Sequence, residues 1–228
     1  MTTHYRFPDQ PERAYSGSTG LTAGNRCGIY RGFVKRMLDV LLVLLGAPFV
    51  LLLVLILAAL IASDGGKPFY CQDRVGLGGR VYRIWKLRSM DVDADEKLAA
   101  YLDANPAART EWDHSQKLRR DPRITRIGQF LRRSSVDELP QLWNVLRGDM
   151  SLVGPRPMMP SQRAFYPGEA YYLLRPGITG LWQVSARNES GFAARAGYDS
   201  EYDRTLSLAT DLRLLAATVR VVARGTGC

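Results

Sequence analysis

Two adjacent carboxylates, Asp137 and Glu138, stand just before Pro140. Residues 139–146 repeat apolar side chains at a spacing that places them on one face of a helix. A proline in the first helical turn costs no intrahelical hydrogen bond, whereas a proline further in would remove one. This pattern predicts that the helix begins at Asp137, with Asp137 as its N-cap.

A carboxylate at the start of a helix has a structural and a chemical interpretation. Aspartate is a preferred N-cap and glutamate is common in a first turn, so stability alone explains both residues. The same position also keeps a carboxylate ionised and offers backbone N–H groups to a phosphate. An ionised Asp137 can attack phosphorus to form an ester, or it can bind Mg²⁺, which prefers carboxylate and phosphate oxygens.

Arginines gather on both sides of this pair. Residues 119–133 contain six arginines and one acid, and Arg132 and Arg133 come just before the carboxylates. Arginine at every position favours forked phosphate binding, and a solvated charged face explains the cluster equally well. Arg156 stands between two prolines and Arg175 stands beside Pro-Gly, so each marks either a rigid turn or a preset phosphate contact.

The segment 40–62 carries no charged residue. At ~1.5 Å per residue it reaches about 35 Å, enough to span the apolar core of a bilayer. Pro48 predicts a kink, and basic residues flank both ends, whereas a spanning helix usually has asymmetric flanks. We expect residues 31–63 to form a re-entrant membrane helix, with a straight span as the alternative. Asp39, at the apolar edge, is expected to pair with Arg36.

The other parts of the chain are more polar. Residues 1–30, rich in Gly, Ser, Thr and Pro, are expected to be a disordered tail. Residues 64–228 are expected to form one domain, with a β-hairpin around the glycines of residues 76–79. Apolar residues spaced by four and three over 208–222 predict a C-terminal amphipathic helix, which packs on the domain or lies on a membrane surface. The predicted fold class is therefore α+β, mostly helical with a small hairpin.

The composition narrows the classes of function. A net charge of +9 favours a membrane surface, a phosphorylated substrate or nucleic acid. Aromatic residues do not alternate with the arginines, so we expect no nucleic-acid partner. Three widely spaced cysteines and two histidines predict neither a disulfide framework nor a zinc site. A nucleic-acid binder and a structural component of an export complex are the alternatives, and the clustered Asp137–Glu138 pair argues against both.

Several segments, taken together and in this order, resemble the bacterial sugar transferases known as monotopic phosphoglycosyl transferases. The short chain with one membrane segment is similar to the exopolysaccharide-initiating members that transfer galactose 1-phosphate to undecaprenyl phosphate. The resemblance rests on residues 35–39, Pro48, and residues 85–90, 135–141, 150–157 and 175–180.

The resemblance implies a mechanism and a set of site residues. It implies that Asp137 is the nucleophile, that Glu138 is its partner, and that a covalent phosphosugar ester forms as UMP leaves. It also implies that Mg²⁺ is required, with Asp137 as a ligand. The residues implied to lie near the phosphates or the nucleotide are Lys86, Arg132, Arg156 and Arg175.

The resemblance also implies partners and a location. The donor would be a UDP-sugar and the acceptor undecaprenyl phosphate in the bacterial inner membrane, with the catalytic domain on the cytoplasmic face. The reaction would be the first membrane step of exopolysaccharide synthesis. Family members often carry serine before the helix-breaking proline, and this chain has Ala47, which cannot bond a freed carbonyl. Galactose, glucose and modified sugars stay open, as does the oligomeric state, a homo-oligomer included.

Overall fold

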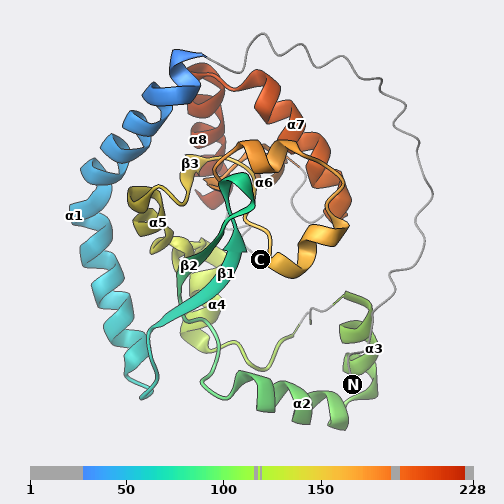
Figure 1. Ribbon diagram of the computed structural model, residues 1–228. Helices are drawn as coiled ribbons and strands as arrows, with labels where there is room; N and C mark the ends of the chain where they lie inside the picture. The colour runs from blue at the N-terminus through green and yellow to red at the C-terminus, as the bar shows by residue number, and fades with distance from the viewer. Residues whose placement is uncertain (1–27, 116–117, 119, 186–190, 224–228) are drawn as a thin grey trace.

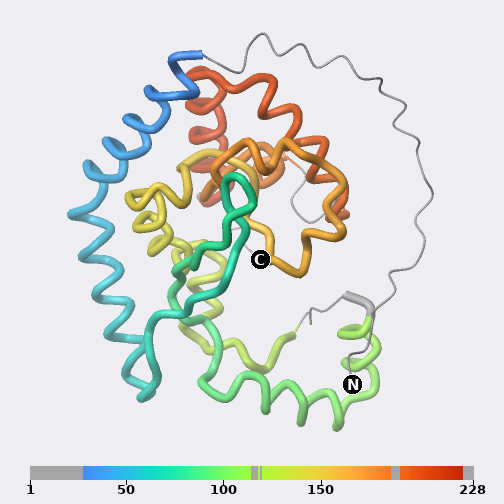
Figure 2. The backbone as a smooth tube through the Cα atoms, in the orientation of Figure 1, coloured from blue at the N-terminus to red at the C-terminus, as the bar shows by residue number. Residues whose placement is uncertain are grey.

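The computed structural model describes residues 28–115, 118, 120–185 and 191–223. A long helix, α1 (Lys35–Ala62), runs along one side, and the other helices and two small sheets lie beside it (Figures 1 and 2). The predicted α+β class, mostly helical with a small hairpin, is confirmed. The tail expected over residues 1–30 lies almost wholly outside the described residues.

Helix α1 follows a π-helical turn, Tyr30–Val34. Pro48 lies inside α1, and the helix continues past it while bowing around the rest of the molecule (Figure 1). Within the described residues, Tyr30–Ala62 is one helix that is long and apolar enough to cross a membrane. The length and composition of the segment thus agree with the membrane helix expected from the sequence.

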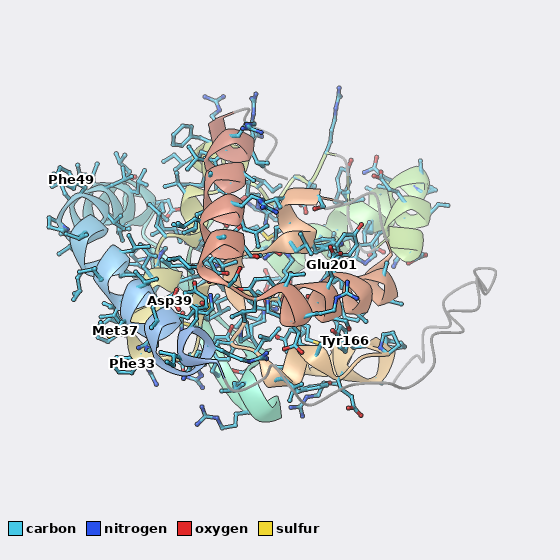
Figure 3. All side chains as sticks on the ribbon, turned by 90° about the horizontal axis from the view of Figure 1, so that it is seen from above. Phe33, Met37, Asp39, Phe49, Tyr166 and Glu201 are labelled. Atoms are coloured by element: carbon cyan, nitrogen blue, oxygen red, sulfur yellow. The ribbon has the colours of Figure 1, made fainter. Side chains whose placement is uncertain are left out.

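One side of α1 packs on the domain along most of its length. Near its first half, Val43 contacts the buried side chains of Val145 and Met150. Near its second half, Leu57 and its neighbours pack in a cluster with Leu87 and Leu131. The opposite side is apolar and exposed, and Figure 3 shows two of its side chains, Met37 and Phe49, together with Phe33 of the preceding turn.

The polar residues at the start of α1 also face the domain, which corrects one expectation. Asp39 is buried and accepts a hydrogen bond from the backbone N–H of Leu152 at 3.1 Å (Figure 3). Arg36 donates to the carbonyl oxygens of Val145 and Leu146. The expected pairing of Asp39 with Arg36 is therefore wrong, because the domain supplies a separate partner to each.

The predicted hairpin is present. Strands β1 (Phe69–Val75) and β2 (Val81–Leu87) pair antiparallel, with Tyr70 opposite Lys86. The turn between them places Gly78 and Gly79 at φ values of +64° and +79°. Only glycine adopts such angles without strain, so the glycine cluster of the sequence is explained by the turn.

A second, parallel ladder joins the two arginine-proline motifs of the sequence. Strand β3 (Ser151–Val153) precedes Arg156, and strand β4 (Gly177–Thr179) follows Arg175. The backbones approach so closely that a Cβ on Gly177 would lie 2.1 Å from the backbone nitrogen of Gly154. These glycines are therefore required by packing between two segments that the sequence separates by about twenty residues.

Short helices make up most of the domain. Thr125 caps α4, with its hydroxyl accepting a hydrogen bond from the backbone N–H of Gly128 at 2.9 Å. Helices α2 and α3 lie at the edge of the molecule away from the start of α1 (Figure 1). The helices are α2 (Ala94–Ala104), α3 (Pro106–Ser115), α4 (Arg126–Ser134), α5 (Gln141–Arg147), α6 (Leu181–Ser185), α7 (Arg195–Thr205) and α8 (Leu208–Ala223).

Most of the apolar stripe predicted on the C-terminal helix is exposed, and only its residue Leu215 packs against a buried cluster of the domain. Helix α8 turns Asp211 and Leu214 inward, both 4% exposed, whereas Leu212 is 54% and Val219 is 70% exposed. Tyr30 and Lys35 both bind the carboxylate of Asp211 and so hold α8 beside the start of α1. The stripe consists of Leu208, Leu212, Leu215, Val219 and Val222; all of these but the half-buried Leu215 are exposed.

Candidate active site

The two carboxylates lie in a tight turn between helices. Helix α4 ends at Ser135, whose φ of +57° makes it the one non-glycine residue with positive φ among the described residues. A 3-10 turn, Val136–Glu138, follows, and α5 then begins with Pro140 as its N-cap. The predicted N-cap role of Asp137 is therefore wrong. Pro140 lacks an N–H and stands at the helix boundary itself, so the carboxylates precede α5 within a separate turn.

Lys86 on β2 binds this carboxylate pair. Its Nζ lies 2.7 Å from Oε1 of Glu138 and 3.9 Å from Oδ2 of Asp137. All three side chains are largely buried. The structure thus joins Asp137, Glu138 and Lys86, three of the residues expected at the site, although β2 lies about fifty residues earlier in the chain.

Asn144 fixes the relative position of β2 and the carboxylates. It is fully buried, at 0% exposure. Its Oδ1 accepts from the backbone N–H of Trp85 at 3.1 Å, and its Nδ2 donates to the carbonyl oxygen of Arg83 at 2.7 Å. The side chain therefore pairs with β2 much as a neighbouring strand would, on both sides of Ile84, two residues before Lys86. Sequence reasoning missed Asn144, because only the fold reveals its two backbone partners.

Electrostatics separate the two carboxyl groups. Burial raises the pKa of Asp137. The positive charge of Lys86 lowers this pKa and the negative charge of Glu138 raises it, and the net result lies above the usual value for aspartate. Burial also acts to raise the pKa of Glu138, but Lys86 and then Arg156 outweigh it, so that pKa lies below its usual value. A helix N-terminus was expected to keep Asp137 ionised. In the structure Asp137 is not at a helix N-terminus, and burial instead raises its pKa and so favours the protonated form.

Arg132 and Arg156 also lie near the pair. The positive charge of Arg132 acts on Asp137, and its Nε donates to the hydroxyl of Ser89 at 3.0 Å. Arg156 acts on Glu138, and its guanidinium carbon lies 5.8 Å from the centre of the Trp182 ring. Among the other arginines of residues 119–133, Arg123 pairs with Asp121, and Arg119 lies outside the described residues.

Arg175 occupies a different part of the molecule. Its Nε donates to the carbonyl oxygen of Gly148 at 3.1 Å, and the charges that act on it are those of Arg36, Asp39 and Arg80. It lines a cavity of about 580 Å³ at the start of α1, which neither Asp137 nor Glu138 lines. The structure therefore brings five of the six expected site residues together and separates Arg175 from them.

An apolar groove opens beside the carboxylates. It has a volume of about 310 Å³ and lies between α1 and α5. Leu139 and Trp85 line it, and each is the chain neighbour of a site residue, Glu138 and Lys86 respectively. Further lining residues include Ala47, Val50 and Leu51 of α1, and Pro140, Leu142 and Trp143 at α5.

The site offers few protein ligands to a metal. No group of three or more His, Cys, Asp or Glu side chains gathers in the described part of the chain. Mg²⁺ typically takes one or two carboxylates and completes its shell with water and substrate phosphates. Asp137 fits this arrangement, because within the described residues its ion-pair partner Lys86 is 3.9 Å away and no other side chain is hydrogen-bonded to it.

Known proteins share this sequence over nearly the whole described length. A UDP-galactose-lipid carrier transferase of Erwinia amylovora is 46% identical over 201 residues, which cover 86% of this chain and 41% of the relative. The exopolysaccharide production protein ExoY of Rhizobium meliloti is 42% identical over 202 residues, 86% of this chain and 88% of the relative. An undecaprenyl-phosphate glucose phosphotransferase of Komagataeibacter xylinus is 40% identical over 203 residues, 82% of this chain and 35% of the relative.

The chain thus spans about two fifths of the length of the Erwinia relative and most of the length of ExoY. The family described as bacterial sugar transferase matches residues 30–225, from the turn before α1 to the end of α8 and beyond. That range contains the long apolar helix α1, the carboxylate pair and the arginines around it. The chain belongs to the bacterial sugar transferase family.

Proposed function

We propose that this protein transfers a sugar 1-phosphate from a UDP-sugar to undecaprenyl phosphate, releasing UMP, as the first membrane step of exopolysaccharide synthesis. The observation that carries the proposal is the Asp137–Glu138 pair bound by Lys86, whose chain neighbours Leu139 and Trp85 line an apolar groove together with α1. Two relatives are named as transferases that act with a lipid carrier or undecaprenyl phosphate. The proposed sugar is galactose, and the names of the relatives include both galactose and glucose.

The proposed mechanism has two displacements at one phosphorus. An oxygen of Asp137 attacks the phosphorus that bears the sugar, and the bond from that phosphorus to the bridging oxygen breaks, so UMP leaves with the electron pair. A phosphate oxygen of the acceptor then attacks the same phosphorus, and the bond to Asp137 breaks. The acceptor oxygen is already ionised at neutral pH, so neither step requires a strong base. The raised pKa of Asp137 makes its ionised form more basic and hence a better nucleophile.

Positive charge around the pair would stabilise the transferring phosphate. Lys86 acts on both carboxylates, Arg132 acts on Asp137 and Arg156 acts on Glu138. Glu138, whose pKa is lowered, stays ionised and holds Lys86 in place through its 2.7 Å ion pair. When bound, Mg²⁺ would be held by Asp137 and the donor phosphates and would neutralise phosphate charge.

The apolar groove is proposed to receive the lipid end of the acceptor. An isoprenoid chain gains free energy by leaving water for an apolar surface, at roughly 25 cal/mol per Å². The groove is lined by α1, which would lie in the membrane, and it reaches Leu139, next to Glu138. An acceptor seated there would bring its phosphate from the bilayer directly to the carboxylates.

The membrane topology is proposed to be re-entrant, with the domain on the cytoplasmic face of the inner membrane. The same domain contacts both halves of α1, and both helix ends are tied to it, through Lys35 to Asp211 and through Asp64 to Arg88. A straight span would carry one end about 30 Å away across the bilayer. The exposed stripe of α8 adjoins the start of α1 and would rest on the same membrane surface.

Cysteine labelling tests this topology. Gly28→Cys and Lys67→Cys, each in a background lacking the three native cysteines, flank α1. Both should be shielded from a membrane-impermeant reagent in intact cells and should react after the cells are opened. Labelling of one site alone in intact cells would establish a straight span. Pro48→Leu should increase such one-sided labelling, because it restores the hydrogen bond that proline removes.

Product analysis tests the reaction. Purified protein incubated with undecaprenyl phosphate and a panel of UDP-sugars should release UMP, fastest with UDP-galactose. Without acceptor, UMP release should stop at one equivalent per enzyme, and radiolabelled sugar phosphate should stay on the protein until undecaprenyl phosphate is added. Asp137→Asn should abolish both label and turnover. Appreciable turnover by Asp137→Asn would disprove the nucleophile assignment and favour Glu138 or direct attack.

A further inference from the structure

Three half-buried arginines are close enough for their charges to act on one another, and one of them also acts on Glu138. Two of the three were not singled out in the sequence. Arg74 lies on β1, Arg156 follows β3, and Arg195 begins α7. The backbone N–H of Val75 donates to the carbonyl oxygen of Met158 at 3.0 Å, which brings β1 alongside the segment of Arg156.

Aromatic rings hold Arg195 and Arg156 in place. The guanidinium carbon of Arg195 lies 4.2 Å from the centre of the Trp182 ring and 4.9 Å from that of Phe192. Arg156 lies over the same Trp182 ring at 5.8 Å. Cation–π contacts of this kind orient a guanidinium without neutralising its charge.

The arginine cluster of Arg74, Arg156 and Arg195 lacks acidic partners. Among the ion pairs within the described residues, none involves these three side chains. The Nε atoms of Arg74 and Arg195 are buried without a hydrogen-bond partner. The charge of Asp199 acts on Arg195 without forming an ion pair with it. The carboxylate of Asp199 instead accepts a hydrogen bond from the hydroxyl of Tyr166 at 2.7 Å, and burial raises the pKa of Asp199 to about 6.

Unpaired cations in this position are costly in the free protein. Burial, together with the charges of Arg156 and Arg74, lowers the pKa of Arg195 to about 10, although Asp199 acts in the opposite direction. Burial also lowers the pKa of Arg74, with Arg156 as the next contribution. Buried charges are normally paired, so a cluster that repels itself and keeps unused donors is suited to an anionic ligand.

We propose that Arg74 and Arg195, together with Arg156, bind the nucleotide-side phosphate of the donor diphosphate, the one that leaves in UMP. This inference rests on the proposed function. Arg156 connects the two parts of the site, because its charge acts on Glu138 and on both other arginines. In a UDP-sugar, the leaving phosphate is separated by one bridging oxygen from the phosphorus that Asp137 attacks.

The donor is favoured over the acceptor as the source of this phosphate. The lipid groove is lined by α1, by α5 and the turn before it, and by one residue from each hairpin strand, Phe69 and Trp85, and none of the three arginines lines it. An acceptor phosphate arriving through the groove meets Lys86 first, because Trp85 lines the groove. The arginine cluster lies on the Glu138 side, because its member Arg156 acts on Glu138. Three arginines there would neutralise the charge that develops on the leaving UMP.

Binding measurements on the full chain in detergent test the proposal. Arg74→Gln and Arg195→Gln should each weaken UDP binding about tenfold to a hundredfold in calorimetry, since each removes charge-assisted hydrogen bonds to phosphate. Binding of uridine, which has no phosphate, should stay unchanged. Arg83→Gln is the matched control, because that exposed side chain lies 3.8 Å from Asp73 on the same hairpin.

Kinetics identify the source of the phosphate. In both glutamine variants the KM for UDP-sugar should rise about tenfold or more, and the KM for undecaprenyl phosphate should change less than twofold. A rise in the acceptor KM alone would assign the cluster to the lipid phosphate and overturn the proposal. Unchanged UDP affinity in both variants would overturn it as well.

Lysine variants keep the test decisive if the glutamine variants fail to fold. Arg74→Lys, Arg156→Lys and Arg195→Lys retain the charge and lose the forked donor, so UDP should bind several-fold more weakly to each. Wild-type UDP affinity in all three would overturn the proposal. Absence of sugar-phosphate transfer by the wild-type protein with every UDP-sugar would instead refute the proposed function, whatever the UDP affinities are.

Discussion

Asn144→Ala tests whether the side chain of Asn144 sets the distance between Lys86 and the carboxylates. The change removes two hydrogen bonds, to the backbone N–H of Trp85 at 3.1 Å and to the carbonyl oxygen of Arg83 at 2.7 Å. Each contributes about 1 kcal/mol net, and leaving the backbone groups unpaired adds a desolvation cost. The truncation also leaves a small void at a fully buried position.

These contributions together destabilise the protein by about 2–4 kcal/mol. For a chain of this size, 1 kcal/mol shifts Tm by roughly 2–4 °C, so Tm should fall by about 4–16 °C. The catalytic effect should be larger than the loss of folded protein explains. Lys86 sits on the strand that Asn144 holds, and a displacement of about 1 Å at a reacting group can cost a hundredfold in rate.

Thermal unfolding followed by tryptophan fluorescence measures the stability, and UMP release at a temperature where the variant is folded measures kcat. Arg147→Ala is the matched control on the same helix. Its side chain is 57% exposed and lies 3.4 Å from Asp149, so Tm and kcat should stay close to wild type. A wild-type Tm for Asn144→Ala would refute the structural reasoning, and a lowered Tm with wild-type kcat would refute the positioning role.

Three further predictions follow from the same turn. Asp137→Asn should raise the free energy of unfolding at neutral pH. Folding raises the pKa of Asp137, so its carboxyl group favours the folded state only at pH values below the pKa that it has in the unfolded chain. The gain should therefore fade in thermal melts as the pH falls toward about 4. Glu138 has a lowered pKa and contributes stability above its unfolded value. Glu138→Gln should therefore lower kcat and Tm at pH 7, and the free energy of unfolding should fall by about 3 kcal/mol. This loss of stability should shrink in acid. Ser135→Gly should leave the protein equally or slightly more stable, whereas Ser135→Val should cost about 1 kcal/mol or more in chemical unfolding, because φ is +57° there.

Features that depend on short stretches of chain were predictable from the sequence. The apolar run of residues 40–62 predicts the long helix, because no soluble pattern explains so many uncharged residues in succession. The glycines of residues 76–79 predict the hairpin turn, which needs positive φ at Gly78 and Gly79. The carboxylate pair was also recognisable, since Asp137, Glu138 and Pro140 are neighbours whose types restrict the backbone around them.

The electrostatics of the site depend on residues that are distant in sequence. A local argument from the start of a helix predicted an ionised Asp137, and the boundary was displaced because Pro140 became the N-cap of α5. Burial in the folded protein then raised the pKa of Asp137, and Lys86 and Arg156 lowered that of Glu138. Lys86 lies on a strand and Arg156 beyond α5, so no local pattern could have supplied their distances.

Arg156 and Arg175 show what the sequence determined and what only the tertiary structure decided. Both carry the same local signature, an arginine beside proline and near glycine, and the sequence predicts a restricted backbone at each. The parallel pairing of β3 with β4 then places Arg156 next to Glu138 and Arg175 next to Arg36 and Asp39. Local sequence determines how stiff a segment is, because sterics act between neighbouring residues. The direction in which its side chain points depends on which distant backbone the segment pairs with.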